Sequence, residues 1–355
     1  MELVLDKLIS FSIPLMLSSI LQLLFNAVDI VVVGRFSGSR ALAAVGSTTA
    51  LINVFTNLFI GVSLGANVLA ARFYATKQEK QMSETVHTAV TFALISGIVM
   101  VFVGLFFSKA ALLLMDTPSD VIGQSALLYA DLFSPECPSF MLYNYGAAIL
   151  RAVGDTKRPL FFLIIAGIVN AALNLFLVIV LHLGVAGVAI ATVIAQMISC
   201  LLVLRCLYRS DGSYQLRFSA MTIKWIYLKQ IFQVGIPAGI QSTVINFSNV
   251  LLQSSVNSFG SIAMAGYTAA NNIFGFLYAA ANSITQACMS FTSQNYGAGK
   301  WKRMDKVLRN CILLSVVVSL ILGGGSYLFG PELLKIYTSD PKVINAEWKY
   351  FCILP

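Results

Sequence analysis

Long apolar runs constrain the fold of this chain more than any other feature of its sequence. A helix that crosses a membrane needs about 20 consecutive, mostly apolar residues. Nine stretches of the chain meet this requirement, and a tenth begins near residue 346. The nine stretches are 11–33, 47–70, 88–108, 127–150, 160–181, 184–204, 231–256, 263–291 and 310–330. The sequence therefore predicts an all-α, polytopic membrane protein.

The balance of charged and apolar residues excludes a soluble enzyme. Only 11% of the residues are charged, against about 25% in a typical soluble domain, and the mean hydropathy is +0.82. A net charge of +8 could indicate a nucleic-acid partner. The basic residues, however, lie between the apolar runs, where they are typical of loops beside a membrane. We therefore expect lipid around the chain and no nucleic acid bound to it.

The distribution of basic residues predicts the orientation of the chain. Of the 23 Lys and Arg residues, 17 fall in loops on the side of the N-terminus and 5 fall on the other side. The remaining one, Lys349, lies in the tenth apolar stretch. Because cytoplasmic loops carry an excess of Lys and Arg, we expect the N-terminus in the cytoplasm and the chain in a bacterial inner membrane.

An internal repeat relates the two halves of the chain. A shift of 222 or 223 residues aligns Pro14 with Pro237 and Tyr74 with Tyr296. Six predicted spans precede the second copy, so both copies enter the membrane from the same side. Such a parallel repeat predicts two six-helix bundles related by an axis along the membrane normal.

The repeat also predicts the domain boundaries. We expect an N-terminal lobe over residues 1–208, a cytoplasmic linker over 209–230 and a partial C-terminal lobe over 231–355. The partial lobe holds three helices and the start of a fourth, so we expect a C-terminally truncated chain whose last three spans are missing.

Small residues and prolines predict how some of the helices pack. Pro14 and Pro237 occupy matching positions, where each either begins a helix or bends it. Two pairs of glycines have a four-residue spacing that permits close helix approach: Gly61 with Gly65, and Gly235 with Gly239.

Asp29 is the clearest candidate for a functional residue. It lies near the outer end of the first predicted span, surrounded by aliphatic residues. An ionised side chain at membrane depth is costly, so it indicates function by default. The alternative is an interfacial aspartate near a helix end. We favour the functional interpretation, in which Asp29 binds a coupling ion or a proton.

Other polar side chains fall in the same membrane layer on the predicted topology. They are Tyr129, Asn144, Asn170, Asn174 and Thr192. Oxygen ligands suit a hard cation, whereas a carboxylate alone can carry a proton. For Asn170 and Asn174, which lie one helical turn apart, hydrogen bonding between helices is an equal alternative.

Two further acids, Asp131 and Glu136, lie in the outer part of the fourth predicted span. They either line the mouth of a pathway, join the ion pathway, or mark a span that begins later than residue 127. No acid lies between residues 231 and 291, so any coupled ion is expected in the first half.

The sequence lacks the common motifs of enzymes and metal sites. It contains no P-loop, no His-Glu-x-x-His pattern and no dinucleotide fingerprint, so ATP is not expected as the energy source. Its six cysteines form no Cys-x-x-Cys pair. His87 and His182 fall near loops, where we expect them to be solvated. We predict no metal site and no cofactor apart from a coupling cation, Na⁺ or H⁺.

Two segments resemble a known family. Residues 149–159, Ile-Leu-Arg-Ala-Val-Gly-Asp-Thr-Lys-Arg-Pro, are similar to the L-R-A-x-G-D-T-K-x-P segment of the multidrug and toxic compound extrusion (MATE) family. Residues 28–35 resemble the first-span motif of that family. The resemblance covers essentially the whole chain. It implies antiport of organic cations or other amphiphiles against Na⁺ or H⁺, by alternating access of two lobes around a central cavity. We expect the transporter to be a monomer.

The resemblance also implies an ion site in the N-terminal lobe. The positions of that site in similar members fall on Asp29, Tyr129, Asn144, Asn170, Asn174 and Thr192. Several members carry a second aspartate where this chain has Asn174. Its absence is expected to weaken Na⁺ binding or to leave Asp29 as the lone proton carrier.

Two other functions stay open at this point. A flippase for a lipid-linked precursor or a polysaccharide shares the two-lobe plan, but its cavity would present several cationic residues to a pyrophosphate. Lys and Arg are nearly absent from the predicted first-lobe spans, which favours cationic or neutral cargo. The other alternative is a membrane fragment that does not transport.

Overall fold

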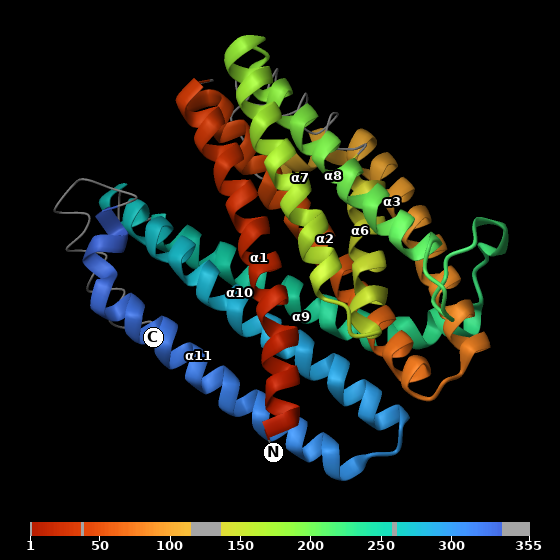
Figure 1. Cartoon of the computed structure of the whole chain (residues 1–355). Helices are drawn as coiled ribbons and strands as arrows, with labels where there is room; N and C mark the ends of the chain where they lie inside the picture. Colours follow the sequence, from red (N-terminus) through yellow and green to blue (C-terminus); the bar gives the residue numbers. More distant parts are fainter. Residues whose placement is uncertain (1, 37–38, 115–135, 258–260, 336–355) are drawn as a thin grey trace.

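The protein is described by a computed structural model that covers residues 2–36, 39–114, 136–257 and 261–335. Within these residues the secondary structure is helical, with no strand, which confirms the predicted all-α class (Figure 1). The helices are α1 (Glu2–Phe36), α2 (Ser39–Ala75), α3 (Glu79–Leu114), α6 (Glu136–Ala152), α7 (Lys157–Leu175), its π-helical continuation η2 (Phe176–Val180), α8 (Gly184–Tyr208), the short 3-10 turn η3 (Phe218–Ala220), α9 (Trp225–Asn257), α10 (Ser261–Gly297) and α11 (Trp301–Lys335).

The nine predicted spans coincide with helices in the described part of the chain. The fourth coincides only in part, because residues 127–135 lie outside the described residues. The tenth span near residue 346 also lies outside them. Described segments of α1, α2, α3, α8 and α11, and of α7 with η2, are long and apolar enough to cross a membrane. The chain is therefore a multi-pass membrane protein.

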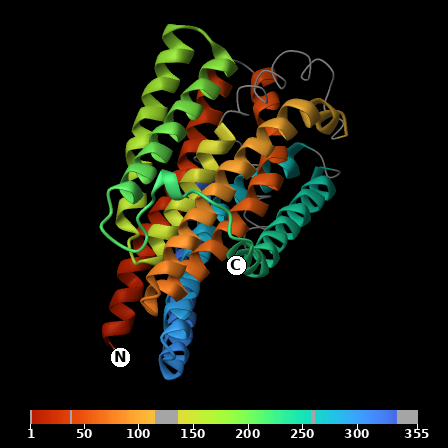
Figure 2. The ribbon, with the colours of Figure 1, turned by 90° about the vertical axis from the view of Figure 1, so that its right-hand side faces the viewer.

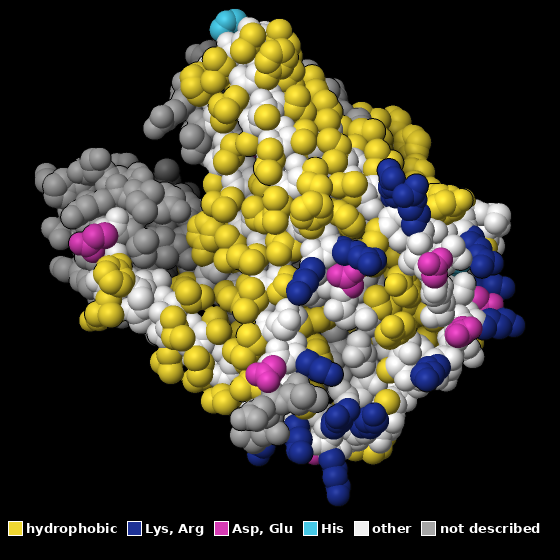
Figure 3. Space-filling model, viewed as in Figure 1, with side chains coloured by type: hydrophobic (Ala, Val, Ile, Leu, Met, Phe, Trp, Pro, Cys, Tyr) yellow, Lys and Arg dark blue, Asp and Glu magenta, His cyan; other side chains and the backbone are white. Residues whose placement is uncertain are grey.

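The helices alternate in direction, so the bundle has two distinct ends. We call the end where α1 begins, and where the α2–α3, α6–α7 and α10–α11 turns lie, the basic end. The opposite end, which holds the α7–α8 turn, is called the far end. Figure 3 shows Lys and Arg side chains gathered towards the basic end and a broad apolar surface above them. This surface has the character of one that faces lipid.

The C-terminal helices pack against one side of the N-terminal ones. Helix α9 lies along α2, α10 packs against α1 and α2, and α11 packs against α10 (Figures 1 and 2). The division into lobes at residues 208 and 231 stays a prediction.

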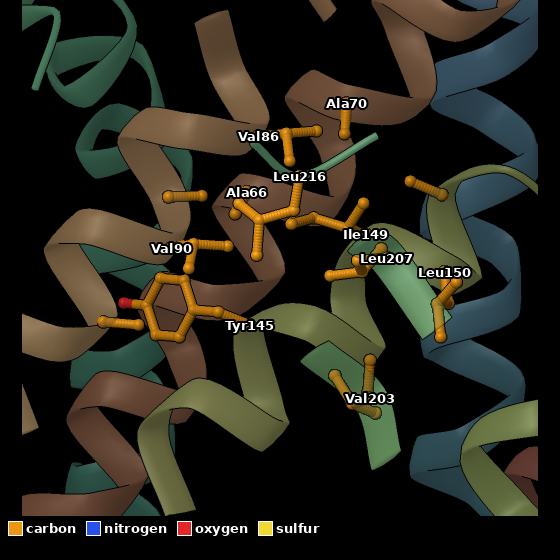
Figure 4. Packing of buried hydrophobic residues seen from close by; sticks show 14 of the residues in the cluster. Ala66, Ala70, Val86, Val90, Tyr145, Ile149, Leu150, Val203, Leu207 and Leu216 are labelled. Carbon is orange, nitrogen blue, oxygen red and sulfur yellow. The ribbon is translucent and has the colours of Figure 1, made fainter. Parts of the chain in front are cut away.

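The segment between α8 and α9 folds back over the basic end of the N-terminal helices. Leu216 from this segment is fully buried in a core formed with side chains of α2, α3, α6 and α8 (Figure 4). The backbone N–H of Arg217 donates to Nε2 of His87 at 3.0 Å, and Nδ1 of His87 lies 2.6 Å from the carbonyl oxygen of Ser83. The prediction of a solvated His87 is therefore wrong, because the segment from residue 209 covers it.

The paired glycines bring α2 and α9 into direct backbone contact. A Cβ atom added to Gly61 would collide with the backbone of Gly239, and one added to Gly65 would collide with the carbonyl oxygen of Ile231. The predicted close approach of these helices is confirmed. Close packing of this kind is a main source of helix association where lipid removes the hydrophobic driving force.

Both matched prolines lie inside their helices. Pro14 is in α1 and Pro237 is in α9, each more than one turn from the helix start. The alternative in which they begin a helix is therefore wrong. The carbonyl oxygen of Pro14 accepts a hydrogen bond from Oγ of Ser18 at 2.8 Å, which is a common accompaniment of bent transmembrane helices.

The glycine contact gives a direct test of the fold. We expect Gly61→Ala to lower the apparent melting temperature of the purified protein, because overpacking a tight contact costs about 1–3 kcal/mol. Gly323→Ala on α11 is the matched control, since a Cβ atom there meets open space. The measurement is a thermal unfolding curve in detergent, and equal melting temperatures for the two variants would contradict the observed contact.

Candidate functional site

A cavity of about 690 Å³ lies between the N-terminal helices and α10. Its volume is in the range of small-molecule sites in proteins. Apolar side chains such as Leu15, Ile60 and Phe274 share its wall with amides and hydroxyls. The charged side chains among its described lining residues are Asp29, Glu136 and Arg151.

Asp29 is held on the cavity wall by side chains from two other helices. It is 6% exposed, and its Oδ1 accepts a hydrogen bond from Nδ2 of Asn174 at 2.5 Å. Its Oδ2 lies 3.2 Å from Oγ1 of Thr192. Asn170 completes the group, since its Oδ1 accepts from Asn174 at 3.1 Å and its Nδ2 donates to Thr192 at 3.3 Å. We call these four residues the Asp29 cluster.

The local sequence explains why these side chains meet. Asn170 and Asn174 are four residues apart on α7 and so share one helical face. Gly167, one turn earlier, leaves no room for a Cβ atom, because the ring of Phe25 on α1 packs against it. Phe25 and Asp29 share a face of α1 in the same way. The contact of Phe25 with Gly167 thus brings the carboxylate next to the two asparagines.

The Asp29 cluster can hold either a proton or a small cation. In the observed arrangement, donors from Asn174 and Thr192 compensate the carboxylate of Asp29. Oδ1 of Asn174 is buried and has no hydrogen-bond partner among the described residues. Turning that amide over would direct its oxygen at the same space as the carboxylate. Carboxylate, amide and hydroxyl oxygens would then converge, which suits a hard cation.

The π-helical turn η2 begins two residues after Asn174. Insertions of this kind in α-helices are frequent at functional sites. Its presence directly after the asparagine pair is a structural feature that apolar periodicity does not predict.

The remaining predicted site residues have separate outcomes. Asn144 lines the same cavity, but its Nδ2 donates to the carbonyl oxygen of Phe140 on its own helix at 2.8 Å. Its role as an ion ligand stays a prediction. Tyr129 and Asp131 lie outside the described residues.

Glu136 belongs to the cavity as a second buried acid. It is 4% exposed, and its Oε2 has no hydrogen-bond partner among the described residues. It lies in the first turn of α6, at the far end of that helix. The structure therefore brings Glu136 into the cavity that Asp29 lines.

Arg151 is a cavity residue that the sequence analysis assigned to a loop. Helix α6 continues to Ala152, and the side chain of Arg151 lines the cavity. Lys and Arg are still scarce in the predicted first-lobe spans, but Arg151 brings one cationic side chain to the cavity from the end of α6. The sequence signal was the uninterrupted aliphatic and alanine run from residue 147 to 150, which extends the helix past the predicted boundary.

Hydrogen bonds between α10 and the N-terminal helices close the cavity towards the basic end. Oγ of Ser290 donates to Oδ1 of Asn67 on α2 at 2.7 Å, and Oγ of Ser293 donates to the carbonyl oxygen of Val68 at 2.5 Å. Nε2 of Gln294 donates to the carbonyl oxygen of Ala152 on α6 at 2.8 Å. We call these contacts the floor of the cavity.

Comparison with known proteins identifies relatives of the chain. A family profile described as MatE matches residues 14–176 and 237–354. The probable multidrug resistance protein YoeA of Bacillus subtilis is 29% identical, over 97% of this chain and 75% of the relative. A second probable multidrug resistance protein of that bacterium, YpnP, is 27% identical, over 98% of this chain and 77% of the relative.

Solved structures share the fold. A multidrug resistance MATE family transporter of the MOP superfamily, in an outward-facing conformation, superposes with a TM-score of 0.91. It is 20% identical in sequence, over 98% of this chain and 78% of that chain.

The composition of the Asp29 cluster gives a test of cation binding. Asn174→Asp places a second carboxylate beside Asp29, so we expect the variant to melt at a lower temperature than the wild type without a small cation. We expect Na⁺ to raise its melting temperature more than that of the wild type. A cation at 100 times its dissociation constant stabilises a folded protein by about 2.7 kcal/mol.

The measurement is thermal unfolding of the purified protein in sodium chloride and in choline chloride at equal ionic strength. Asn295→Asp is the matched control, because Asn295 lies near the end of α10 and is not among the lining residues of the cavity. If the melting temperature of Asn174→Asp rises with Na⁺ no more than that of the control, the Asp29 cluster does not form a cation site.

Proposed function

The chain belongs to the MatE family, as its resemblance to MATE transporters indicated, and we propose that it exports cationic or other amphiphilic small molecules in exchange for Na⁺ or H⁺. The single observation that carries this proposal is the position of Asp29. Its carboxylate is buried at the end of a candidate membrane span, on the wall of a cavity large enough for a drug-sized molecule. The coupling ion and the substrate would therefore meet in one cavity.

Coupling requires that the ion bind the two conformations with different affinity. The Asp29 cluster supplies a basis for that difference, because its groups come from α1, α7 and α8. Any change in the packing of these helices alters the distances between the carboxylate and its donors. In the proposed cycle, binding of the ion at Asp29 from outside favours release of the substrate on that side.

The closed floor supports an assignment of the conformation. With the basic end in the cytoplasm, as the excess of Lys and Arg there favours, the floor separates the cavity from the cytoplasm. This is the arrangement of an outward-facing state, and the solved transporter that superposes with a TM-score of 0.91 is described as outward-facing. The proposed site of action is a bacterial inner membrane, and the proposed transporter is a monomer.

The names of the relatives support a drug as the exported molecule. YoeA and YpnP are each described as a probable multidrug resistance protein. The apolar part of the cavity wall, with Phe274 and Leu15, suits flexible recognition of amphiphiles. Whether Na⁺ or H⁺ drives the exchange is the part of the proposal that the following experiment decides.

We expect purified protein in liposomes to move a cationic dye when a Na⁺ gradient or a pH gradient is imposed separately. Asp29→Asn should abolish the response to the effective gradient, because a neutral amide at Asp29 neither releases a proton nor balances the charge of a cation. The measurement is dye fluorescence in the liposome lumen over time.

Asp211→Asn is the matched control for this experiment, since Asp211 is an exposed carboxylate in the segment between α8 and α9. It should respond like the wild type. If Asp29→Asn protein retains gradient-driven dye movement at the rate of the control, Asp29 does not couple the ion to transport.

A further inference from the structure

Arg151 places an isolated positive charge on the wall of the cavity. It lies in the last turn of α6, next to the floor, with its side chain among the lining residues. A buried charge is costly unless it is paired or fully hydrogen-bonded. The partners of this guanidinium therefore indicate what the position is built to hold.

Arg151 makes one side-chain hydrogen bond to the described residues. Its Nη1 donates to Oε1 of Gln286 on α10 at 3.2 Å. Among the described residues, its buried Nε has no hydrogen-bond partner, and no carboxylate lies within ion-pair distance of the guanidinium. A guanidinium carries five N–H donors in a fork that matches a carboxylate. A single neutral amide satisfies only a small part of that capacity.

The acids of the cavity do not fill this gap. Glu136 and Arg151 occupy opposite ends of α6, and their separation of 15 positions corresponds to a rise of about 22 Å. Asp29 lies in the outer part of α1 and is engaged by Asn174 and Thr192. The negative and positive charges of the cavity are therefore separated along its length, with the positive charge beside the floor.

We propose that Arg151 is a subsite for the anionic group of the substrate, and that it selects amphiphiles that carry a carboxylate. Gln286 occupies this subsite in the conformation seen here. A carboxylate accepts stronger hydrogen bonds from a guanidinium than an amide oxygen does. Gln286 thus acts as a weak internal competitor that α10 brings to Arg151 when the floor is closed.

Because Gln286 competes for Arg151, the affinity of the subsite depends on the position of α10 in the transport cycle. This step rests on the proposed function. When α10 separates from α6 at the basic end, Arg151 loses Gln286 and can bind a carboxylate that arrives from that side. When α10 returns, Gln286 again takes up Nη1 and favours release of the carboxylate. The same movement that closes the floor therefore weakens substrate binding.

Two dyes that differ only at the carboxylate test this proposal. Rhodamine B carries a free carboxylate beside its cationic ring system, whereas its ethyl ester lacks that anion. We expect the purified wild-type protein in detergent to bind rhodamine B about tenfold more tightly than the ester, the effect of one charged hydrogen-bonded group. The measurement is fluorescence anisotropy during titration with protein.

Arg151→Gln should abolish the preference for rhodamine B over the ester. Arg158→Gln is the matched control, because Arg158 is exposed, pairs with Asp155 at 3.2 Å and does not line the cavity. It should keep the wild-type preference. Gln286→Ala should increase the affinity for rhodamine B only, because it removes the competitor.

Equal affinity of the wild type for the two dyes overturns the proposal, as does an equal loss for both dyes in Arg151→Gln. If that variant does not fold, Gln286→Ala decides the question, and the absence of any gain for rhodamine B overturns it. The readout is binding without an ion gradient. A failure of gradient-driven efflux in liposomes would therefore contradict the proposed function and leave this test intact.

Discussion

The buried carboxylate of Asp29 constrains how α1, α7 and α8 pack against one another. At membrane depth an uncompensated polar group costs several kcal/mol, so the donors around Asp29 are structural necessities. They come from Asn174 on α7 and Thr192 on α8. One acid on α1 thereby fixes the relative positions of three helices. The charge at Asp29 and the packing of these helices are therefore linked, and this link is the physical basis of the ion coupling proposed here.

Two kinds of contact hold the C-terminal helices against the N-terminal ones. Between α2 and α9, glycine backbones touch directly, so this contact depends on shape alone. Between α10 and the floor residues, the contacts are hydrogen bonds whose groups water can also satisfy at modest net cost. In the proposed transport cycle, the floor is therefore the contact that would separate and re-form, while the glycine contact would stay packed.

Those features that follow from helical periodicity and membrane depth could be predicted from the sequence. The spans, the shared face of Asn170 and Asn174, and their place in the same membrane layer as Asp29 belong to this group, whereas the meeting of the three residues in one site was implied by the family resemblance. The environments of His87 and Arg151 could not be predicted in this way. Each depends on where a distant segment lies, the α8–α9 connection in one case and α10 in the other. The role of the Asp29 cluster stays a prediction, since geometry alone does not identify the bound ion.

The floor has a further consequence for how such a protein can evolve. Ser293 and Gln294 donate to main-chain carbonyls of α2 and α6, and every residue type supplies the same carbonyl. Substitutions at Val68 or Ala152 thus leave the acceptors in place. Substitutions that remove one of these two bonds must therefore replace the donor, Ser293 or Gln294, on α10. The strength of the floor can in this way change without any substitution in the residues of the Asp29 cluster.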